Sequence, residues 1–455
     1  MTGWLTKSPG KLVHMPMPYI VGRWVRGRSH YGRERLINYL LDVQEAATWV
    51  VGTRRMGKTS LLRQLEFITD QPDSHFVPLI WDLQGCDHTG DLSKELFFAL
   101  EDSADRFASL GIDIAPLADQ DAVATVRRLS RSLAERNRRL LLLMDEAEVL
   151  IHIGEQDPAW LAHLRKALQE GRHHTVMTST KLLTQLNDLA VGWKTSPFLF
   201  GFNLANLWQL DLDAALALVR QTQSDTPVAV DDGALDDIIT HTNRHPYLIQ
   251  YLCQRLYQVD DHGNGTLRPV DDEDLAPDHL LAGFFQIDFQ HLSRIERRIL
   301  LAIAEPDIVS DRQLLTAISD ESPARTRTFL FGLNKLGYVR QVHGQWALGN
   351  EYLRRWVQDH FHALSCQLDS AIDDHTVEVL LQTGKQNELI YLQGELDRLQ
   401  QRFAALQAHG AGAEVDASLA REIERVDDDL TRVQRELQLA RNGACSGGSS
   451  GPTGR

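Results

Sequence analysis

The sequence predicts an α/β domain with a parallel sheet, followed by helix-rich regions that end in a coiled coil. Three observations carry this prediction. Short apolar runs alternate with longer amphipathic stretches between residues 31 and 202, which is the order of strands and helices in a parallel α/β sheet. Residues 206–285 are largely helical in pattern, and two leucine-rich heptad repeats lie near the C-terminus.

Composition narrows the class of protein. The 455 residues suffice for two to four domains. Lys and Arg number 47 against 62 Asp and Glu, a net charge of −15, so DNA binding would need a local basic face.

Cysteine spacing and hydropathy predict a soluble, cytoplasmic protein without contact to a membrane. No CxxC pair is present, which argues against zinc and against a secreted disulfide framework. No apolar stretch approaches the roughly 20 residues of a membrane helix, and no signal peptide is visible. The four widely spaced cysteines are Cys86, Cys253, Cys366 and Cys445.

The α/β domain is expected over residues 23–205, after an irregular lead-in at 1–22 that contains Pro9, Pro16 and Pro18. Each apolar run is followed by helix-like sequence, as a parallel sheet requires. The expected strands are residues 48–51, 76–82, 140–145, 175–178 and 198–200.

Two further domains are expected before residue 366. The first, 206–285, is helical, with helices at 211–221, 234–242 and 247–256. The second, 286–365, has the order of a winged helix, because a two-stranded hairpin around His343-Gly344 follows three helices. Ser322 and Pro323 are suitable N-cap and N1 residues for the third of these helices. The three helices are expected near 291–303, 311–319 and 323–336.

Residues 370–441 predict a coiled-coil hairpin. Two heptad seams flank the segment HGAGAEVDAS, which predicts antiparallel arms of roughly 40 Å each. Residues 442–455, rich in Gly and Ser, are expected to form a flexible tail. The seams are Leu389, Leu392, Leu396, Leu399, Phe403, Leu406 and then Leu419, Ile423, Val426, Leu430, Val433, Leu437.

The segment GTRRMGKT, residues 52–59, fits the phosphate-binding pattern G-x-x-x-x-G-K-[ST] at every fixed position. Glycines let consecutive backbone N–H groups curl around an anion, and the following helix directs its positive end toward that anion. Lys58 is expected to reach the β- and γ-phosphates, and the Thr59 hydroxyl to ligand Mg²⁺. The expected nucleotide-binding residues here are Gly52, Thr53, Arg54, Arg55, Met56, Gly57, Lys58, Thr59 and Ser60.

A strand that ends in two carboxylates supplies the second part of this site. The run RLLLLMDE, residues 139–146, ends in Asp145 and Glu146. Asp145 is expected to hold Mg²⁺ through its water shell, and Glu146 to polarise the attacking water. Glu148 is the alternative base. The predicted catalytic residues are therefore Lys58, Asp145 and Glu146, with Thr59 and Asp145 at the Mg²⁺.

The next expected strand ends in Thr178, Ser179 and Thr180. A polar residue beside the acidic strand is suited to sense a γ-phosphate. The same hydroxyls are equally suited to cap a helix that begins near Lys181. Both interpretations stay open on the sequence.

With these motifs, the chain resembles the STAND branch of the AAA+-related P-loop NTPases, especially prokaryotic members close to archaeal ATPases. The phosphate loop with its paired Arg54 and Arg55 carries the resemblance, together with Asp145 and Glu146. The segments PYIVG at 18–22, YGRE at 31–34 and HPYL at 245–248 contribute as well. The resemblance covers about residues 16–360.

The resemblance implies a P-loop core, a helical lid and a winged helix, with ATP or ADP and Mg²⁺ as cofactors. It also implies residues around the base: Tyr31, Gly32 and Arg33 near the adenine, and His245 with Pro246 closing over it from the lid. The family usually has glycines where this chain has Asn243 and Arg244. Arg244 is interpreted either as a residue that reaches a phosphate or as a solvated surface arginine.

The family typically uses ATP as a switch, in which a trigger releases a closed form and permits oligomerisation that activates an effector. The resemblance therefore implies a slow ATP hydrolase that acts as a regulatory switch. Two other hypotheses are a DNA-handling AAA+ ATPase of the origin-recognition or transposition-helper type, and a nucleotide-bound scaffold without turnover. Kinases and transport ATPases are disfavoured, because neither a lid-arginine pattern nor an ABC-type signature is present.

The last two regions each have two interpretations. The winged helix is either an internal hinge or a DNA reader that uses Arg325, Arg327, Lys335 and Arg340. Ten Lys/Arg and nine Asp/Glu over residues 281–360 leave 10 − 9 = +1, which predicts weak DNA binding. The coiled coil is either an arm for self-association or for a separate effector protein, or a solvated hairpin packed against the body.

Overall fold

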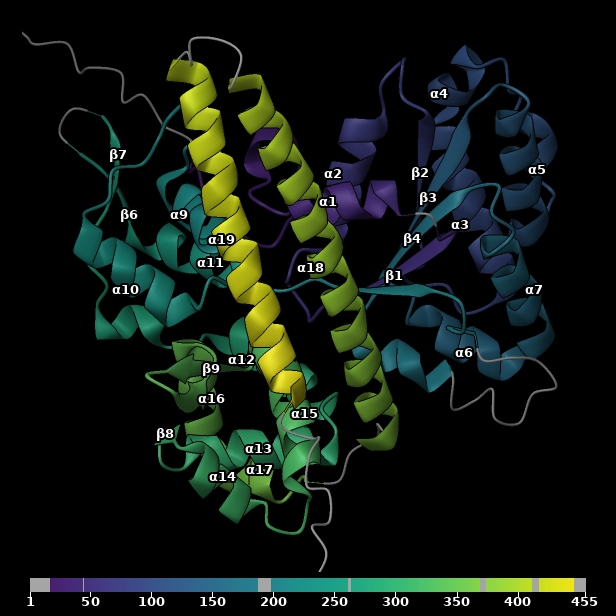
Figure 1. Ribbon diagram of the computed structural model, residues 1–455. Coiled ribbons are helices and arrows are strands. Elements are labelled where there is room, and N and C mark those ends of the chain that lie inside the picture. Colours follow the sequence, from purple (N-terminus) through teal and green to yellow (C-terminus); the bar gives the residue numbers. More distant parts are fainter. Residues whose placement is uncertain are drawn as a thin grey trace, which may run out of the picture.

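The computed structural model describes residues 17–43, 45–186, 198–260, 263–368, 374–410 and 417–445. Its N-terminal domain is a five-stranded parallel sheet in the order β2-β3-β4-β1-β5, with helices on both faces (Figure 1). The central strand β3 is apolar and buried along most of its length, as expected for a strand covered on both faces. The strands are β1 (Ala47–Val51), β2 (Phe76–Asp82), β3 (Arg139–Asp145), β4 (His174–Ser179) and β5 (Asn203–Asn206).

The predicted α/β core is confirmed, and its first four strands begin and end within one residue of the predicted bounds. The fifth strand was predicted wrongly at 198–200. Those residues form a turn, in which Phe198 is buried in the core and Phe200 is exposed. The strand itself follows at Asn203–Asn206, where only two of four residues are apolar, so its hydrophobic signal is weak.

Two apolar clusters fill the two sides of the sheet. One contains α1 and α2 side chains, and the other contains side chains of α3, α5, α6 and α7. The helices of this domain are η1 (Gly27–Ser29), α1 (Glu34–Asp42), α2 (Lys58–Thr69), α3 (Thr89–Asp102), α4 (Ala104–Ser109), η2 (Ala115–Leu117), α5 (Ala122–Ala134), α6 (Val149–Gln156), α7 (Pro158–Leu168) and η3 (Lys181–Thr184).

A second module, residues 212–290, is mainly helical. Its three predicted helices are present, and the short hairpin β6–β7 was not predicted. The lead-in joins this module, because the buried Tyr19 donates a hydrogen bond to the carbonyl of Val219 at 2.6 Å; residues 1–16 lie outside the described residues. The elements are α9 (Leu212–Arg220), α10 (Asp232–Thr242), α11 (Pro246–Leu256), β6 (Tyr257–Val259), β7 (Gly265–Leu267), η5 (Asp272–Leu275) and α12 (His279–Gln290).

A third module, residues 294–365, contains the three predicted helices and the predicted hairpin. The Ser322 hydroxyl accepts a hydrogen bond from the Arg325 amide at 3.3 Å, and Pro323 occupies the first turn of α15. A short third strand, β8, pairs with the hairpin. The elements are α13 (Arg294–Ala304), β8 (Ile308–Val309), α14 (Asp311–Ala317), α15 (Pro323–Lys335), β9 (Val339–Val342), β10 (Gln345–Leu348), α16 (Glu351–Asp359) and α17 (Phe361–Ser365).

Two long helices, α18 (Asp374–Gly410) and α19 (Ala417–Cys445), lie side by side across the front of the molecule in Figure 1. We call them the C-terminal helix pair. They are antiparallel, because Arg402 contacts Glu422 while Arg441 contacts Gln393. The flexible tail was predicted from residue 442, but α19 continues to Cys445, so the prediction is wrong for residues 442–445. Residues 411–416 and 446–455 are outside the described ranges. None of the described helices is both long and apolar enough to cross a bilayer.

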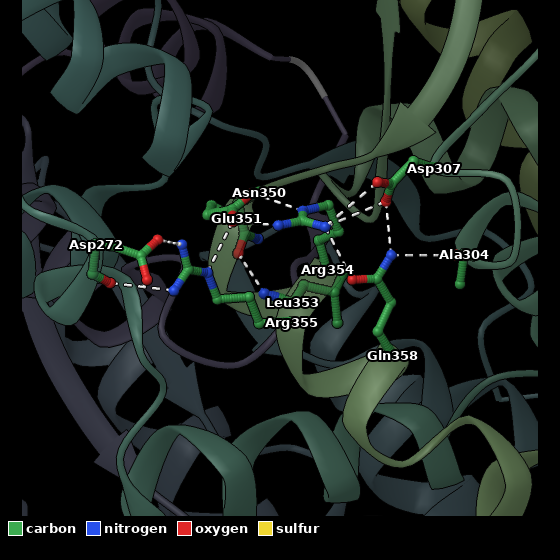
Figure 2. A network of polar contacts seen from close by, with 9 residues as sticks. All are labelled: Asp272, Ala304, Asp307, Asn350, Glu351, Leu353, Arg354, Arg355 and Gln358. Carbon is green, nitrogen blue, oxygen red and sulfur yellow. Dashed lines mark hydrogen bonds and ion pairs between the residues drawn. The ribbon is translucent and has the colours of Figure 1, made fainter.

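Figure 2 shows a polar network at the start of α16. Glu351 pairs with Arg354 at 2.5 Å and with Arg355 at 2.7 Å. Arg355 also pairs with Asp272 of η5, and Arg354 with Asp307. Burial raises the pKa of the Glu351 carboxyl, but the hydrogen bonds from both arginines outweigh burial and hold this pKa below its usual range. The network therefore joins the second module to the third.

The N-cap of α16 yields a test of local stability. Asn350 accepts a hydrogen bond from the Leu353 amide at 2.8 Å. We expect Asn350→Ala to cost about 1 kcal/mol, and so to raise the hydrogen-exchange rate of the α16 amides about fivefold. Asn350→Asp keeps a side-chain acceptor and should exchange at the wild-type rate. Equal rates in Asn350→Ala and wild type would contradict the assigned cap.

Candidate functional site

The phosphate loop connects β1 to α2 at the carboxyl edge of the sheet. Its two glycines are required by geometry. A Cβ on Gly52 would lie 3.1 Å from the Leu207 Cβ, and Gly57 has a φ of +98°, which favours glycine. Gly57 caps α2, whose first residue is Lys58. The loop therefore has the close backbone approach and the helix N-terminus that an anion site needs.

Lys58 is a buried cation within this loop. Its side chain is 7% exposed, and its Nζ lies 3.4 Å from the carbonyl oxygens of both Gly52 and Thr53. Among the described residues, these two carbonyl oxygens are the hydrogen-bond partners of the ammonium group. A buried ammonium group needs a negative partner, so this site suits a phosphate.

Asp145 connects three elements of the site. Its Oδ2 accepts a hydrogen bond from the Thr59 hydroxyl of α2 at 2.6 Å, and its Oδ1 accepts one from the Thr178 hydroxyl of β4 at 2.5 Å. The Asp145 residue is only 3% exposed. A hydroxyl and a carboxylate in contact form the oxygen donor set that Mg²⁺ prefers. The two residues predicted for Mg²⁺ thus lie together.

Glu146 follows in a left-handed conformation, with a φ of 52°. Burial raises the pKa of its carboxyl, the carboxylates of Glu148 and Asp145 add to that rise, and the ammonium group of Lys58 opposes it. A carboxylate with a raised pKa binds a proton more strongly, as a general base should.

The alternative base is held by the backbone. One Glu148 oxygen accepts a hydrogen bond from the Thr180 amide, and the other is buried without a hydrogen-bond partner among the described residues. This contact ties Glu148 to the end of β4. It favours Glu146 as the residue that can face a water.

The three hydroxyls at the end of β4, Thr178, Ser179 and Thr180, have three different partners. Thr178 contacts Asp145, as described above. Ser179 accepts a hydrogen bond from the Trp49 indole at 2.6 Å, and Thr180 accepts one from the Leu182 amide at 3.4 Å. The helix-cap interpretation therefore fits Thr180, while Thr178 orients a site carboxylate.

The two arginines of the loop point to different neighbours. The exposed Arg55 lies over the rings of Tyr247 in α11 and Phe284 in α12, with centroid distances of 5.5 and 4.6 Å. Arg54 has a buried Nε without a hydrogen-bond partner among the described residues.

The other two residues predicted to bind nucleotide contact the protein itself. Ser60 contacts the lead-in, because its hydroxyl accepts a hydrogen bond from the Val25 amide at 3.1 Å. Met56 is buried in the core.

The segment predicted near the adenine connects the core to the second module. Tyr31 is buried in the apolar cluster of that module. Gly32 has a φ of +72°, and a Cβ there would lie 2.6 Å from the Ala214 Cβ. Arg33 donates to the carbonyl of Met56 at 3.3 Å and to that of Gln209 at 3.1 Å. The segment therefore contacts the phosphate loop through Arg33.

The other segment predicted at the base begins α11. His245 is its N-cap and Pro246 lies in its first turn. Burial, with a smaller contribution from the positive charge of Arg33, lowers the pKa of His245 to about 4, so its imidazole is neutral. Asn243 and Arg244 have φ values of 47° and 58°, so both adopt the left-handed geometry that glycines would provide without strain. Arg244 is partly buried and is not a fully solvated arginine.

A small cavity between the phosphate loop and the third module was not predicted. Asp288 and His291, at the end of α12, line it together with Gly52 and Thr53. Burial raises the pKa of Asp288 to about 7, against the positive charges of Arg54 and Lys58. The sequence pattern around Asp288 reads as one polar position of an amphipathic helix, so only the fold reveals this carboxyl beside the loop.

A buried ion pair lies next to this cavity. Lys181, at the start of η3, pairs with Glu296 of α13, and their side chains are 8% and 0% exposed. Glu296 also accepts a hydrogen bond from the Ser293 amide at 2.8 Å. The pair links the end of β4 to the third module. The described residues contain no cluster of three or more His, Cys, Asp or Glu suited to a further metal ion.

Comparison with solved structures supports this description of the core. The Walker-type ATPase Paby2304 of Pyrococcus abyssi aligns with 75% of this chain and 100% of its own, at 17% identity and a TM-score of 0.52. The Aeropyrum pernix ORC2 protein, in ADPNP–ADP complexes, covers 73% of this chain and 91% of its own at 13% identity, with a TM-score of 0.42. The Thermotoga maritima RuvB Holliday junction branch migration motor aligns with 73% of this chain over 95% of its own length, at 13% identity and a TM-score of 0.33.

No family model and no curated protein matches the sequence. The likeness to Paby2304 is one of fold, and the TM-scores of the other two are too low to add to it. The chain therefore has the fold of a Walker-type P-loop ATPase core.

Asp288 provides a pH test of the cavity. Its folded pKa of about 7 lies above the unfolded value of about 3.9, so the folded state binds more protons between these values and stability falls as pH rises through them. The variant Asp288→Asn lacks this pH-dependent loss of stability, because its side chain does not ionise. We expect the free energy of unfolding of the variant, relative to wild type, to rise by about 1–4 kcal/mol from pH 4 to 7 and to stay constant above pH 7.

Urea unfolding midpoints of both proteins at several pH values measure this difference. The histidines near the site are the same in both proteins, so their own titration cancels. A difference that does not change with pH would contradict the raised pKa of the Asp288 carboxyl.

Proposed function

We propose that the protein binds ATP or ADP with Mg²⁺ at the phosphate loop and hydrolyses ATP slowly, as a STAND-type switch. The observation that carries the proposal is the 2.6 Å contact between Thr59 and Asp145, beside the buried Lys58. These three residues come from α2 and β3 and meet at the carboxyl edge of the sheet, where parallel α/β folds bind ligands.

Each residue has a defined part in the proposed reaction. Lys58 binds the β- and γ-phosphates, and Thr59 with Asp145 holds Mg²⁺, which neutralises phosphate charge when bound. Glu146 accepts a proton from the attacking water, and its raised pKa favours that transfer. Thr178 keeps the Asp145 carboxylate in position.

The packing of the other modules supports a switch. Arg55 of the loop lies against α11 and α12, and Asp288 at the end of α12 lines the cavity beside the loop. The third module reaches this cavity through Glu296, which pairs with Lys181 of the cavity lining. We therefore assign residues 206–285 as a lid and 286–365 as a winged helix that serves as an internal hinge. A nucleotide that alters the loop would act directly on these contacts.

DNA handling is the weaker alternative. Of the four basic residues proposed to read DNA, Arg325 pairs with Glu321 and Glu378, and Lys335 pairs with Glu388. Arg340 donates to the carbonyl of Thr240. Since carboxylates of α18 pair with two basic residues of α15, few cations of the third module are available to contact DNA phosphates. This supports weak DNA binding.

The hydrolysis proposal is tested by a matched pair of variants. We expect Glu146→Gln to bind ATP with wild-type affinity and to lower the rate of phosphate release about 10²- to 10⁴-fold. Glu148→Gln should leave the chemical step within a few-fold of wild type. Lys58→Ala should lose nucleotide binding, and removal of Mg²⁺ by EDTA should stop hydrolysis. Phosphate release below detection under every condition would instead favour a nucleotide-bound scaffold.

The switch proposal is tested by mass in solution. Light scattering of the Glu146→Gln variant with ADP and then with ATP should show a shift from a smaller species to a defined oligomer. Wild type with a slowly hydrolysed ATP analogue should show the same shift. An identical mass in all nucleotide states would argue against the switch, while hydrolysis stimulated by DNA with a steep salt dependence would favour the DNA-handling alternative.

A further inference from the structure

Helix α18 has two buried stripes, and only one of them faces α19. The other, which we call the body face, consists of residues at heptad spacing that contact the rest of the molecule. Val377 is fully buried in the third module. Gly384 lies so close to β5 that a Cβ would be 3.1 Å from the side-chain nitrogen Nδ2 of Asn206. The body face is Val377, Leu381, Gly384, Glu388 and Tyr391.

The body face binds the third module through α15. Two ion pairs connect the helices: Lys335 to Glu388 at 2.7 Å, and Arg325 to Glu378 at 3.0 Å. Between them, the Leu381 side chain lies where a Cβ on Gly332 would be only 2.3 Å away. Since Glu388 is 8% exposed, its pair with Lys335 is largely shielded from water.

The same helix binds the core domain. Asn387 donates to the Leu204 carbonyl of the edge strand β5 at 3.2 Å. Arg35 of α1 forms a two-pronged pair with Glu395, at 2.6 and 2.8 Å, and a third contact with Glu436 of α19 at 3.3 Å. The Tyr391 hydroxyl donates to the Arg35 carbonyl at 3.2 Å. Thus α18 bridges the core and the third module (Figure 1).

The helix pair has its own apolar seam. Seven buried residues, all in α18 or α19, form it, and Tyr391 is the one body-face residue that packs against them. The pair can therefore leave the body with its own core largely intact. The contacts it would lose are the apolar packing of Val377 and Leu381 and the ion pairs and hydrogen bonds of the body, whose polar groups water can solvate. The seam residues are Leu392, Leu396, Val426, Leu430, Val433, Leu437 and Ala440.

The start of α1 connects this bridge to the phosphate loop. Arg33, the N-cap of α1, donates to the Met56 carbonyl within the loop at 3.3 Å. Arg35 lies two residues later and holds Glu395 and Glu436. A shift of the loop that moves the Met56 carbonyl therefore acts on the same short segment that anchors the helix pair.

We propose that the C-terminal helix pair is a detachable latch that holds the third module against the core, and that Arg33 and Arg35 couple the phosphate loop to it. The latch itself rests only on the contacts of α18. Its control by nucleotide rests on the proposed function.

The latch is tested by charge reversal in the full chain. Lys335→Glu and Glu388→Lys should each raise hydrogen-exchange rates in α15, in β5 and in residues 377–391 at least tenfold. The double variant restores an opposite-charge pair and should return these rates toward wild type. The matched control, Arg402→Glu, breaks the 2.7 Å pair to Glu422 within the helix pair, away from the body, and should leave α15 and β5 unchanged.

Two outcomes would overturn the latch. One is wild-type exchange in α15 and β5 in both single variants. The other is loss of protection along the seam, residues 392–406 and 426–440, at the same rate as the body face, because the pair would then unfold instead of detaching.

The coupling is tested with nucleotide. We expect a slowly hydrolysed ATP analogue, compared with ADP, to accelerate exchange in residues 377–391 of wild type. Arg35→Ala should bind a fluorescent ATP analogue with wild-type affinity but show the same exchange with either nucleotide. If wild type binds both nucleotides and its exchange does not differ, the coupling fails while the proposed function stands. If wild type binds no nucleotide, both fail, and only the charge-reversal result on the latch remains.

Discussion

The two hydrogen bonds that Asp145 accepts from hydroxyl groups are the constraint on which the rest of the site depends. One comes from Thr59 at the start of α2, and the other from Thr178 at the end of β4. In a sheet of order β2-β3-β4-β1-β5, the strand with the acidic residue and the strand with the phosphate loop are not neighbours, and β4 lies between them. Asp145 therefore fixes the distance between the loop and the carboxylates across β4.

Features that depend on residues close together in the sequence could be predicted, whereas features that depend on contacts between distant segments could not. The loop of residues 52–59, Asp145 and four of the five strands depend on local spacing and on apolar runs. The strands begin and end near the predicted bounds, the loop lies between β1 and α2, and Asp145 ends β3. Asp288 and Lys181 depend on which module packs against the loop, so no local pattern identifies them. The body face of α18 is intermediate: its heptad spacing from Val377 to Tyr391 is present in the sequence, but the stronger leucine seam from Leu389 onward obscures it.

The contacts between the core and the third module suit separation better than they suit maximal stability. Removing one partner from a buried pair such as Lys181–Glu296 is costly, because the other charge remains in an apolar setting. Separating the modules has a different result, since both charged groups then meet water. The pairs Lys335–Glu388 and Arg35–Glu395, by which α18 contacts the third module and the core, likewise specify one arrangement of these parts with a modest net gain in free energy.

Residues with a strained, left-handed backbone are concentrated in the segments of the candidate nucleotide site. Within the described chain, nine residues other than glycine have positive φ, and five of them belong to segments of the site. Each left-handed residue costs about 1–2 kcal/mol, so the packing of the fold holds these segments against their local preference. Arg33 contacts the Met56 carbonyl of the loop, and Arg55 of the loop lies over rings of α11 and α12. Asn243 and Arg244 connect α10 to α11, so the strained residues lie in segments that contact one another. The five residues are Arg33, Arg55, Glu146, Asn243 and Arg244.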